Sequence, residues 1–413
     1  MSGNRRVDGA RLWDSLMRMA KIGATERGGV RRLALSALDG QARALFREWC
    51  EDAGLSVRVD AIGNMFAWRA GRDPARKPVL FGSHLDTQPS GGRFDGALGV
   101  LAGLEAMRVL AEQGVETEAP LVLVNWTDEE GARFGHSLMG SAVWAGNLEV
   151  ERAYALADTD GVLVGDALAA IGARGTDMGF PHDGEAYFEL HIEQGPVLER
   201  SGAEIGVVTG GQGMVWYDLL ATGQDAHAGT TPPAARKDAL VCAARVIDLV
   251  DRMMRARGEA GRGTVGELHV SPNSRNTVPG SVRFTAEFRH PNDAELARIA
   301  AQFPREAGFI ARDAHVELKI DTVFRLPATV FDAECIAAVR EATGRLGYSA
   351  QDIVSGAGHD ALSVAKHMPA AMIFVPCADG LSHNETESIT AAQAEAGCNV
   401  LLEAVLAKAG VAG

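Results

Sequence analysis

Four short apolar runs, each followed directly by polar residues, dominate the hydrophobic pattern of the chain. They cover residues 78–81, 119–125, 186–190 and 370–375. Apolar runs of this length, bounded by polar segments, are typical of strands that are buried on both faces of a sheet. Elsewhere apolar residues recur at helical spacing, for example in residues 31–52 and 98–110. The pattern predicts an α/β fold in which helices flank a central mixed sheet.

The pattern changes between residues 213 and 329. Strands are predicted at residues 214–222, 264–270, 281–289 and 315–320, with one helix at residues 234–257 and another from Asp293. The order β-α-β-β-α-β is that of a ferredoxin-like unit. We therefore predict a larger domain made of residues 1–212 and 330–413, into which residues 213–329 are inserted as a smaller domain. The glycine-rich residues 210–213 are expected to act as a hinge.

Length, charge and cysteine usage narrow the class of protein. At 413 residues the chain exceeds the usual size of one domain. Its net charge of −14 disfavours a nucleic acid partner, because binding phosphates requires a basic surface. The cysteines stand singly, which is typical of reduced thiols. The first helical pattern is amphipathic, unlike a signal peptide, and no apolar run approaches the about 20 residues that cross a bilayer. We expect a cytoplasmic protein with no membrane partner.

Acids and imidazoles follow the four apolar runs. In chain order they are His84, Asp95, Glu129, Glu130, His191 and His383. Because α/β enzymes present their chemistry at the carboxyl ends of strands, we expect these side chains to gather at one edge of the sheet. A mixture of imidazole and carboxylate ligands suits zinc and its first-row neighbours, and an open site of this kind serves metal-assisted hydrolysis.

Five of these residues are enough for two metal ions that share one carboxylate. Asp95 is predicted to bridge the ions, with Glu130 and His383 on one ion and His84 and His191 on the other. The remaining acids have other expected roles. Asp86 would orient an imidazole from outside the ligand set. Since adjacent side chains diverge near the end of a strand, Glu129 can transfer protons while its neighbour binds metal.

Eight short motifs occur in order along the chain: GSHLDT, GGRFDGALGV, DEEGARF, HIEQGPVLE, HAGTTP, PNSRNTVPG, GAGHDA and SHNETE. As a set they resemble the N-carbamoyl-L-amino-acid hydrolase, allantoate amidohydrolase and β-ureidopropionase group of the dinuclear metal-dependent aminoacylase and carboxypeptidase superfamily. The match covers nearly the whole chain. The resemblance implies the ligand arrangement given above, and a lid domain that also forms a homodimer.

The resemblance also assigns roles that spacing alone does not. Glu129 matches the general base, and His227 matches a lid histidine that reaches the partner subunit's active site and polarises the scissile carbonyl. In GAGHDA, the backbone N–H of Gly358 is expected to contribute more than the imidazole of His359. Three further positions match residues that hold the substrate: Gln194, Asn276 and Arg289.

Other histidines and arginines are expected to be structural. Arg236 and Arg283 are predicted to be solvated. The histidines without motif context are predicted to lie on the surface or in packed positions: His136, His182, His269, His290, His315 and His367.

The resemblance therefore implies a hydrolase that converts an N-carbamoyl-L-amino acid to the amino acid, carbon dioxide and ammonia, using two divalent ions per subunit. Zinc, manganese, cobalt and nickel all fit the ligands. The substrate is expected to be a small carboxylate with a ureido group. Allantoate amidohydrolase is the first alternative and β-ureidopropionase the second. A metal-binding protein without catalysis is a remote alternative, since Glu129 and all five ligands are present.

Overall fold

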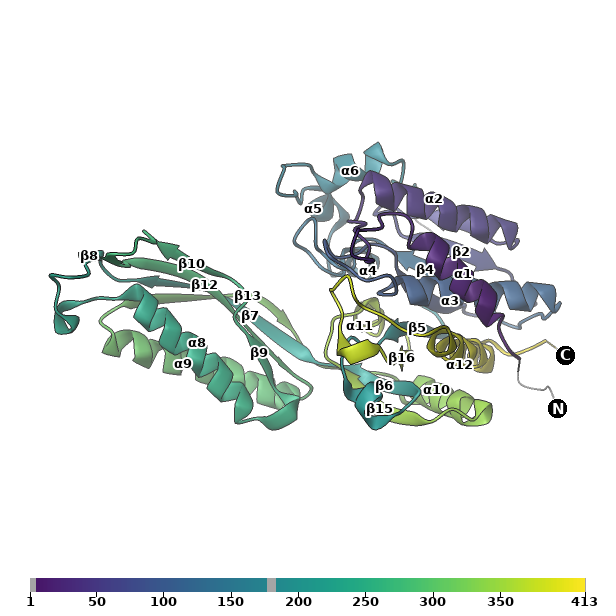
Figure 1. Ribbon diagram of the computed structural model, residues 1–413. Coiled ribbons are helices and arrows are strands. Elements are labelled where there is room, and N and C mark those ends of the chain that lie inside the picture. The colour runs from purple at the N-terminus through teal and green to yellow at the C-terminus, as the bar shows by residue number, and fades with distance from the viewer. Residues whose placement is uncertain (1–4, 177–182, 413) are drawn as a thin grey trace. The chain divides into compact units, whose positions relative to one another are not determined.

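The computed structural model describes residues 5–176 and 183–412 and divides into two compact units (Figure 1). The first unit comprises Met1–Gly210 and Val330–Gly413, and the second comprises Gly211–Thr329. The chain thus leaves the first unit at the glycine-rich residues 210–213.

The first unit is built on a nine-stranded mixed sheet with the order β1-β2-β4-β3-β5-β16-β6-β14, in which β15 also pairs with β6. Its strands are β1 (Ser56–Val59), β2 (Met65–Arg69), β3 (Val79–His84), β4 (Leu121–Trp126), β5 (Ala186–Ile192), β6 (Ile205–Gly211), β14 (Thr329–Val330), β15 (Ala350–Ser355) and β16 (Ala370–Val375). The strands β4, β3, β5 and β16 are mutually parallel, whereas β2 runs antiparallel to β4, and β6 runs antiparallel to β16. The prediction of a mixed sheet is confirmed.

The parallel arrangement brings four strand ends to one edge. Two strands are longer than predicted, so that His84 is the last residue of β3 and His191 lies inside β5. Both had been predicted to follow their strands. The strands extend because their inter-strand pairing continues past the apolar run: His84 pairs with Trp126, and His191 with Phe374.

Helices cover the sheet of the first unit (Figure 1). The long ones are α1 (Gly9–Met19), α2 (Ala37–Asp52), α3 (Ala97–Glu112), α10 (Ala333–Leu346) and α12 (Ala391–Ala409); the short ones are α4 (Met139–Trp144), α5 (Val150–Tyr154), α6 (Val164–Ala170), α7 (Val197–Ser201) and α11 (Asp360–Val364). The α3 helix can lie close to the sheet because it carries glycine at the contact. A Cβ at Gly99 would lie 2.4 Å from the carbonyl oxygen of Leu190. This proximity places the start of α3 beside the ends of β3 and β5.

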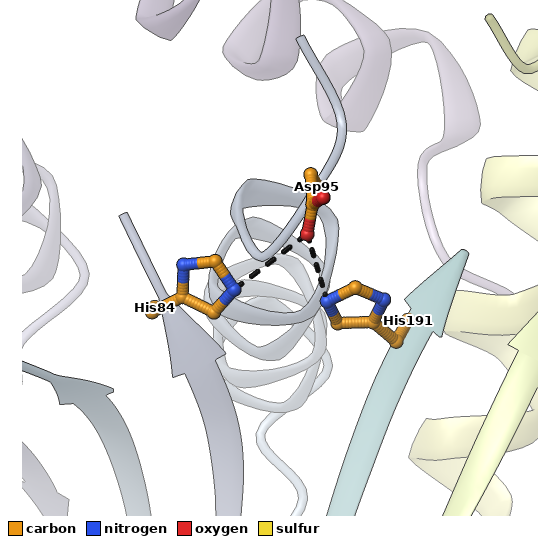
Figure 2. Close-up of side chains that lie close together, drawn as sticks. All are labelled: His84, Asp95 and His191. Atoms are coloured by element: carbon orange, nitrogen blue, oxygen red, sulfur yellow. Dashed lines mark ion pairs between the residues drawn. The ribbon is translucent and has the colours of Figure 1, made fainter. Parts of the chain in front are cut away.

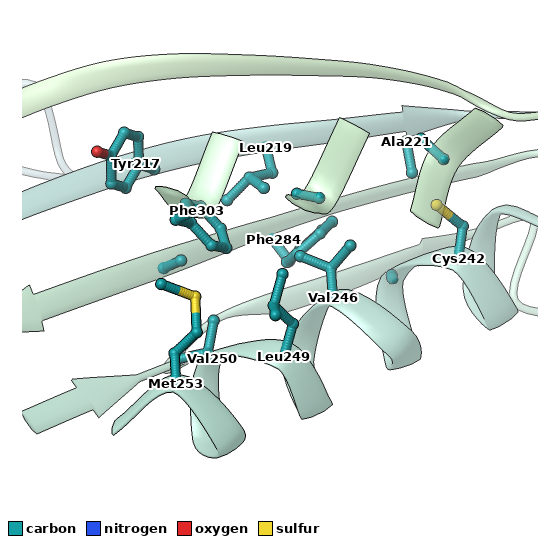
Figure 3. Close-up of a cluster of buried hydrophobic side chains, with 14 of the residues drawn as sticks. Tyr217, Leu219, Ala221, Cys242, Val246, Leu249, Val250, Met253, Phe284 and Phe303 are labelled. Carbon is teal, nitrogen blue, oxygen red and sulfur yellow. The ribbon is translucent and has the colours of Figure 1, made fainter. Parts of the chain in front are cut away.

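The second unit is an antiparallel sheet packed against two helices. Its main sheet has the order β10-β12-β7-β13, with β9 beside β12. The elements are β7 (Gly213–Thr222), β9 (Arg262–Thr264), β10 (Leu268–Ser271), β12 (Ser281–His290), β13 (Glu317–Leu326), α8 (Ala239–Arg255) and α9 (Asp293–Asp313). Leu219, Phe284, Val246 and Phe303 belong to the buried cluster between sheet and helices (Figure 3).

Several details of the second unit differ from the prediction. The single strand expected at residues 264–270 is divided into β9 and β10, which both pair with β12. The α8 helix begins at Ala239 and not near residue 234, because Asp238 caps it by accepting the N–H groups of Leu240 and Val241. A short ribbon that was not predicted pairs β8 (Ala226–His227) with β11 (Thr277–Val278).

Candidate active site

Two imidazoles and a carboxylate meet at the carboxyl edge of the sheet in the first unit (Figure 2). The Nε2 atom of His191 lies 3.2 Å from Oδ1 of Asp95, and that of His84 lies 3.6 Å from the same oxygen. Gly96, at the start of α3, makes this possible, since a Cβ there would lie 2.4 Å from the His84 ring. Atoms of the three side chains all lie within 4.8 Å of one another, close enough to share a metal ion.

A second group of ligand atoms uses the other oxygen of the same carboxylate. The Nε2 atom of His383 lies 3.7 Å from Oδ2 of Asp95 and 3.3 Å from Oε2 of Glu130. His383 comes from the loop after β16, and Glu130 from the segment after β4. These three residues also form a group that could hold a metal ion. Asp95 therefore presents one oxygen to each group.

The shared carboxylate is fixed by neighbours outside both groups. Oδ2 of Asp95 accepts hydrogen bonds from Nε2 of Gln194 and Oγ of Ser382, each at 2.9 Å. The carboxylate of Glu387 accepts the backbone N–H groups of Phe94 and Asp95, both at 3.1 Å. Ser382 and Glu387 were not predicted as site residues, although both lie within the SHNETE motif.

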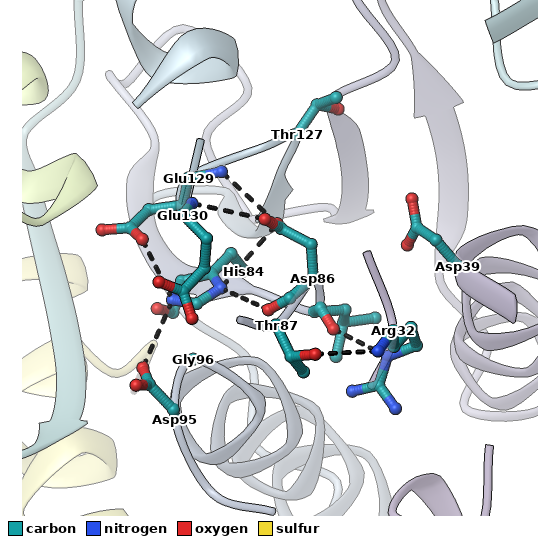
Figure 4. A network of polar contacts seen from close by, with 12 residues as sticks. Arg32, Asp39, His84, Asp86, Thr87, Asp95, Gly96, Thr127, Glu129 and Glu130 are labelled. Carbon is teal, nitrogen blue, oxygen red and sulfur yellow. Dashed lines mark hydrogen bonds and ion pairs between the residues drawn. The ribbon is translucent and has the colours of Figure 1, made fainter. Parts of the chain in front are cut away.

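The orientation of the His84 imidazole is fixed by a contact at Nδ1, the ring nitrogen that does not face Asp95 (Figure 4). Its Nδ1 lies 3.0 Å from the backbone carbonyl oxygen of Asp86, which can only accept, so Nδ1 carries the hydrogen and Nε2 faces the site with a lone pair. The Asp86 carboxylate is further away, at 3.8 Å, and accepts the N–H groups of Glu129 and Glu130 at 3.4 and 3.3 Å. Asp86 thus holds both the imidazole and the segment that carries the two acids.

A buried arginine holds the same loop. Arg32 is only 1% exposed, and its Nε donates to the carbonyl oxygen of Leu85 at 2.7 Å. The backbone N–H of Arg32 donates to Oγ1 of Thr87 at 2.8 Å (Figure 4). Burial lowers the pKa of Arg32 to about 10. The charges of Asp39 and Asp86 oppose this decrease.

Burial and mutual charge perturb the acids and imidazoles strongly. Burial raises the pKa of Glu129, and Asp360 and Glu130 raise it further. Burial, followed by the charge of Asp95, raises the pKa of Glu130. Burial would also raise the pKa of Asp95, but the hydrogen bond and charge of His191 hold it well below the usual range. So many carboxylates in one water-poor site are costly without cations.

The pKa values of the two imidazoles in the first group are shifted in opposite directions. Burial lowers the pKa of His84 to about 4. Burial also opposes the charged form of His191, but its hydrogen bond to Asp95 prevails and raises the pKa to about 9. The Nε2 atom of His84 is buried and accepts no hydrogen bond from the described residues. A neutral imidazole with a free lone pair beside carboxylates fits a divalent cation.

A third cluster lies beside the first group and was not predicted. Glu189, His191 and His359 also bring ligand atoms within 4.8 Å of one another. Glu189 accepts hydrogen bonds from Oγ of Ser83 at 2.8 Å and from the N–H of Ala361 at 2.9 Å. This cluster could have been recognised in the sequence from Glu189, a glutamate inside an otherwise apolar strand.

The remaining predicted residues are divided between the units. Gly358 lies in the first unit, in the loop between β15 and α11. His227 and Asn276 line a cavity of about 330 Å³ in the second unit, together with Asp225, Ala226 and Thr277. Arg289 projects from β12, where its Nε and one terminal nitrogen hold the Glu287 carboxylate at 2.8 and 3.1 Å.

Residues 80–407 match the sequence profile described as peptidase family M20/M25/M40. The chain belongs to this family. The resemblance found in the sequence motifs is thereby confirmed, and the two units correspond to the larger sheet domain and the smaller lid domain that it implied.

Individual relatives of the chain belong to the hydantoinase/carbamoylase group. An N-carbamoyl-L-amino-acid amidohydrolase of Rhizobium meliloti is 47% identical over 98% of this chain and 97% of the relative. An allantoate amidohydrolase of Bacillus subtilis is 33% identical over 95% and 96%. The crystal structure of a hydantoinase/carbamoylase family amidase from Burkholderia multivorans has a TM-score of 0.91 at 51% identity and covers 98% of both chains.

Several expectations about other residues of this M20/M25/M40 chain require correction or comment. Arg283 is exposed, as predicted, but it also pairs with Glu267 at 3.0 Å. Arg236 is not fully solvated, since it is half-buried and donates to two backbone carbonyls. His182 lies outside the described residues. All five cysteines are buried and free. None of the described helices is long and apolar enough to cross a lipid bilayer.

Proposed function

We propose that this protein hydrolyses the ureido group of an N-carbamoyl-L-amino acid. One water molecule is consumed, and the products are the L-amino acid, carbon dioxide and ammonia. The observation that carries the proposal is the pair of ligand groups that share Asp95, one carboxylate oxygen to each group. The relatives of the hydantoinase/carbamoylase group support the substrate class.

The residues of the two groups would hold two divalent ions, of zinc or of manganese, cobalt or nickel. When bound, such ions lower the pKa of water and polarise a carbonyl oxygen. This help is needed because two nitrogens donate electrons to a ureido carbon and make it a poor electrophile. The ligands in this assignment are His84 and His191 on one ion, Glu130 and His383 on the other, and Asp95 on both.

Glu129 is assigned the proton transfers. Its Oε2 lies 3.5 Å from Nε2 of His84, beside the first ligand group, and its backbone is held by Asp86. From this position the carboxylate can take a proton from the attacking water and return it to the departing nitrogen. Its raised pKa, caused by burial and neighbouring acids, favours holding that proton during the reaction.

Five residues are assigned to the substrate. Arg289 binds the carboxylate in competition with Glu287, and the side chain of Gln194 and the backbone N–H of Gly358 contact the ureido end. His227 donates a hydrogen bond to the ureido oxygen as negative charge develops there. Asn276 lies next to it, at the same cavity.

The active protein is proposed to be a cytoplasmic homodimer in which His227 serves the neighbouring subunit. The motif HAGTTP supports the role of His227, and the free cysteines support a reducing compartment. Allantoate is a second candidate substrate, because the Bacillus subtilis allantoate amidohydrolase is similar over almost its whole length and allantoate also combines a carboxylate with ureido groups. N-carbamoyl-β-alanine is the third.

Ammonia release from a substrate panel tests the proposal. Metal-free protein is reconstituted separately with zinc, manganese, cobalt and nickel, and each form is offered N-carbamoyl-L-amino acids, the D enantiomers, allantoate and N-carbamoyl-β-alanine. We expect the highest kcat/KM for an N-carbamoyl-L-amino acid. A higher kcat/KM for allantoate would replace the proposed substrate, and no ammonia release from any compound would refute ureido hydrolysis.

A further inference from the structure

The imidazole of His227 is held by its own loop through one ring nitrogen. Its Nδ1 accepts hydrogen bonds from the backbone N–H groups of Gly229 at 3.0 Å and Thr230 at 3.2 Å. A backbone N–H can only donate, so Nδ1 has no hydrogen in this arrangement. The neutral ring must then carry its hydrogen on Nε2. The loop therefore converts an exposed histidine into a hydrogen-bond donor of fixed orientation.

The loop packs closely against the ring. A Cβ at Gly229 would lie 3.3 Å from Cε1 of His227, so the backbone follows the edge of the imidazole. The N–H of Thr231 donates to the carbonyl oxygen of His227 at 3.1 Å, and the N–H of Ala228 donates to that of Asn276 at 2.9 Å. Residues 227–231 thus form a turn closed at both ends.

A single arginine connects the two ends of this turn. The Nε of Arg236 donates to the carbonyl oxygen of Thr231 at 3.0 Å, and one terminal nitrogen donates to that of Ala228 at 2.7 Å. These two carbonyls lie on either side of the Gly229 and Thr230 N–H groups that hold the ring. A guanidinium can span both carbonyls because its donors form a rigid planar fork.

The arginine is itself fixed in place. It follows the 3-10 helix Pro233–Ala235, and its backbone N–H donates to the carbonyl oxygen of Pro233 at 3.2 Å. Its side chain is half-buried. Arg236 therefore adds two hydrogen bonds from a fixed position to a turn that is otherwise held by its own backbone and by Asn276.

We propose that Arg236 is a positioning residue that keeps His227 in the Nε2–H tautomer, ready to donate to the ureido oxygen. The inference rests on the proposed function, in which His227 meets that oxygen. Without the fork, the Gly229 and Thr230 N–H groups lose their alignment and the ring can adopt the Nδ1–H tautomer. A lone pair would then face the developing negative charge, and the donor would be lost.

Steady-state kinetics of Arg236→Met provide the first test. We expect kcat to fall by about 10- to 10²-fold, the scale of a small misplacement of a catalytic group, with a smaller change in KM. The matched control is Arg245→Met, which removes a guanidinium paired with Asp313 on the exposed face of α8 and should leave kcat unchanged. Arg236→Lys keeps the charge but lacks the rigid planar fork that matches these two carbonyls, so it should resemble Arg236→Met.

A double variant separates positioning from a general loss of structure. In a His227→Ala background, Arg236→Met should lower kcat no further, because both changes remove the same donor. A further fall by the same factor as in the wild type would overturn the proposal. Unchanged kcat in Arg236→Met would also overturn it.

The tautomer itself can be observed without any turnover. Nuclear magnetic resonance of protein with ¹⁵N-labelled histidine distinguishes a protonated from an unprotonated ring nitrogen, and His227→Gln identifies the signal. Wild-type protein at a pH where the ring is neutral should show hydrogen on Nε2 alone, and Arg236→Met should show both tautomers. Hydrogen on Nδ1 in the wild type would overturn the inference even in an active enzyme. If the expected spectra came from a protein that released no ammonia, the tautomer would stand and the proposed function would fail.

Discussion

Glutamine substitutions at two adjacent acids should separate proton transfer from metal binding. Glu129 and Glu130 are neighbours in the chain, the side chains of both are largely buried, and the pKa of each is raised by burial. Only Glu130 belongs to a ligand group. The same substitution at Glu130 therefore serves as the control for Glu129→Gln.

For Glu129→Gln we expect intact metal binding and a large loss of turnover. The carboxylate lies 3.5 Å from Nε2 of His84, and an amide of the same shape fits the position. Glutamine cannot accept the proton of the attacking water, so kcat should fall by about 10²- to 10⁴-fold, or about 3 to 5 kcal/mol in activation free energy.

For Glu130→Gln we expect loss of one ion. The Glu130 carboxylate accepts hydrogen bonds from the backbone N–H of Gln88 at 3.1 Å and from its Nε2 at 2.8 Å. An amide would turn an NH₂ group toward one of these donors, which costs about 1 to 3 kcal/mol. It also removes the negative charge that the ion requires. Occupancy should fall in the group that contains His383.

The assay combines ammonia release with metal analysis of the dialysed protein. Glu129→Gln should retain both ions and Glu130→Gln about one. If Glu129→Gln kept kcat within a factor of a few, its role in proton transfer would be wrong. If it lost metal as readily as Glu130→Gln, the division of labour between the two acids would be refuted.

Three further predictions concern the substrate, the subunits and pH. Arg289→Lys should raise KM for the carboxylate substrate, because lysine lacks the planar fork; equal wild-type cleavage of carboxamide analogues would contradict this role. Mixing inactive His227→Ala and Glu129→Gln subunits should restore activity to at most about half the wild-type level per mixed dimer, and no recovery would show that His227 acts within its own chain. Metal binding should release protons, since the metal-free site holds His191 at a pKa of about 9. The affinity for the metal should then weaken by about tenfold for each pH unit below this pKa and for each proton released. Calorimetry of metal binding in buffers of different ionisation enthalpy measures the released protons, and no release would contradict the prediction.

The fold and the clustering of the candidate ligands were largely predictable because both leave local patterns. The apolar runs before His84, Glu130 and His383 mark buried strands that end in polar residues, and parallel strands bring such ends together. The prediction that Asp95 lies between two ligand groups agrees with its geometry here. The strand lengths were less predictable, because pairing between neighbouring strands, and not the apolar run itself, extends β5 through His191.

The hydrogen bonds that support the site residues could not be predicted, because many of them involve backbone groups. Arg236 and Arg32 both donate to carbonyl oxygens, and a carbonyl gives no sign of its partner in the sequence. The turn at His227 depends on pairing with Thr277, fifty residues away in the chain. Glu189 lies buried within a strand whose other residues are mostly apolar, and its hydrogen-bond partners, Ser83 and Ala361, come from segments that are distant in the chain.

The central claim is that two ions held around Asp95 drive ureido hydrolysis. Its most direct test is the rate of ammonia release from an N-carbamoyl-L-amino acid as metal-free protein is titrated with a divalent cation. Asp95→Ala, which removes the shared carboxylate, serves as the control. The account predicts no turnover without metal, full activity at two equivalents per chain, and no recovery in Asp95→Ala. Turnover by metal-free protein, or a plateau at one equivalent, would contradict it.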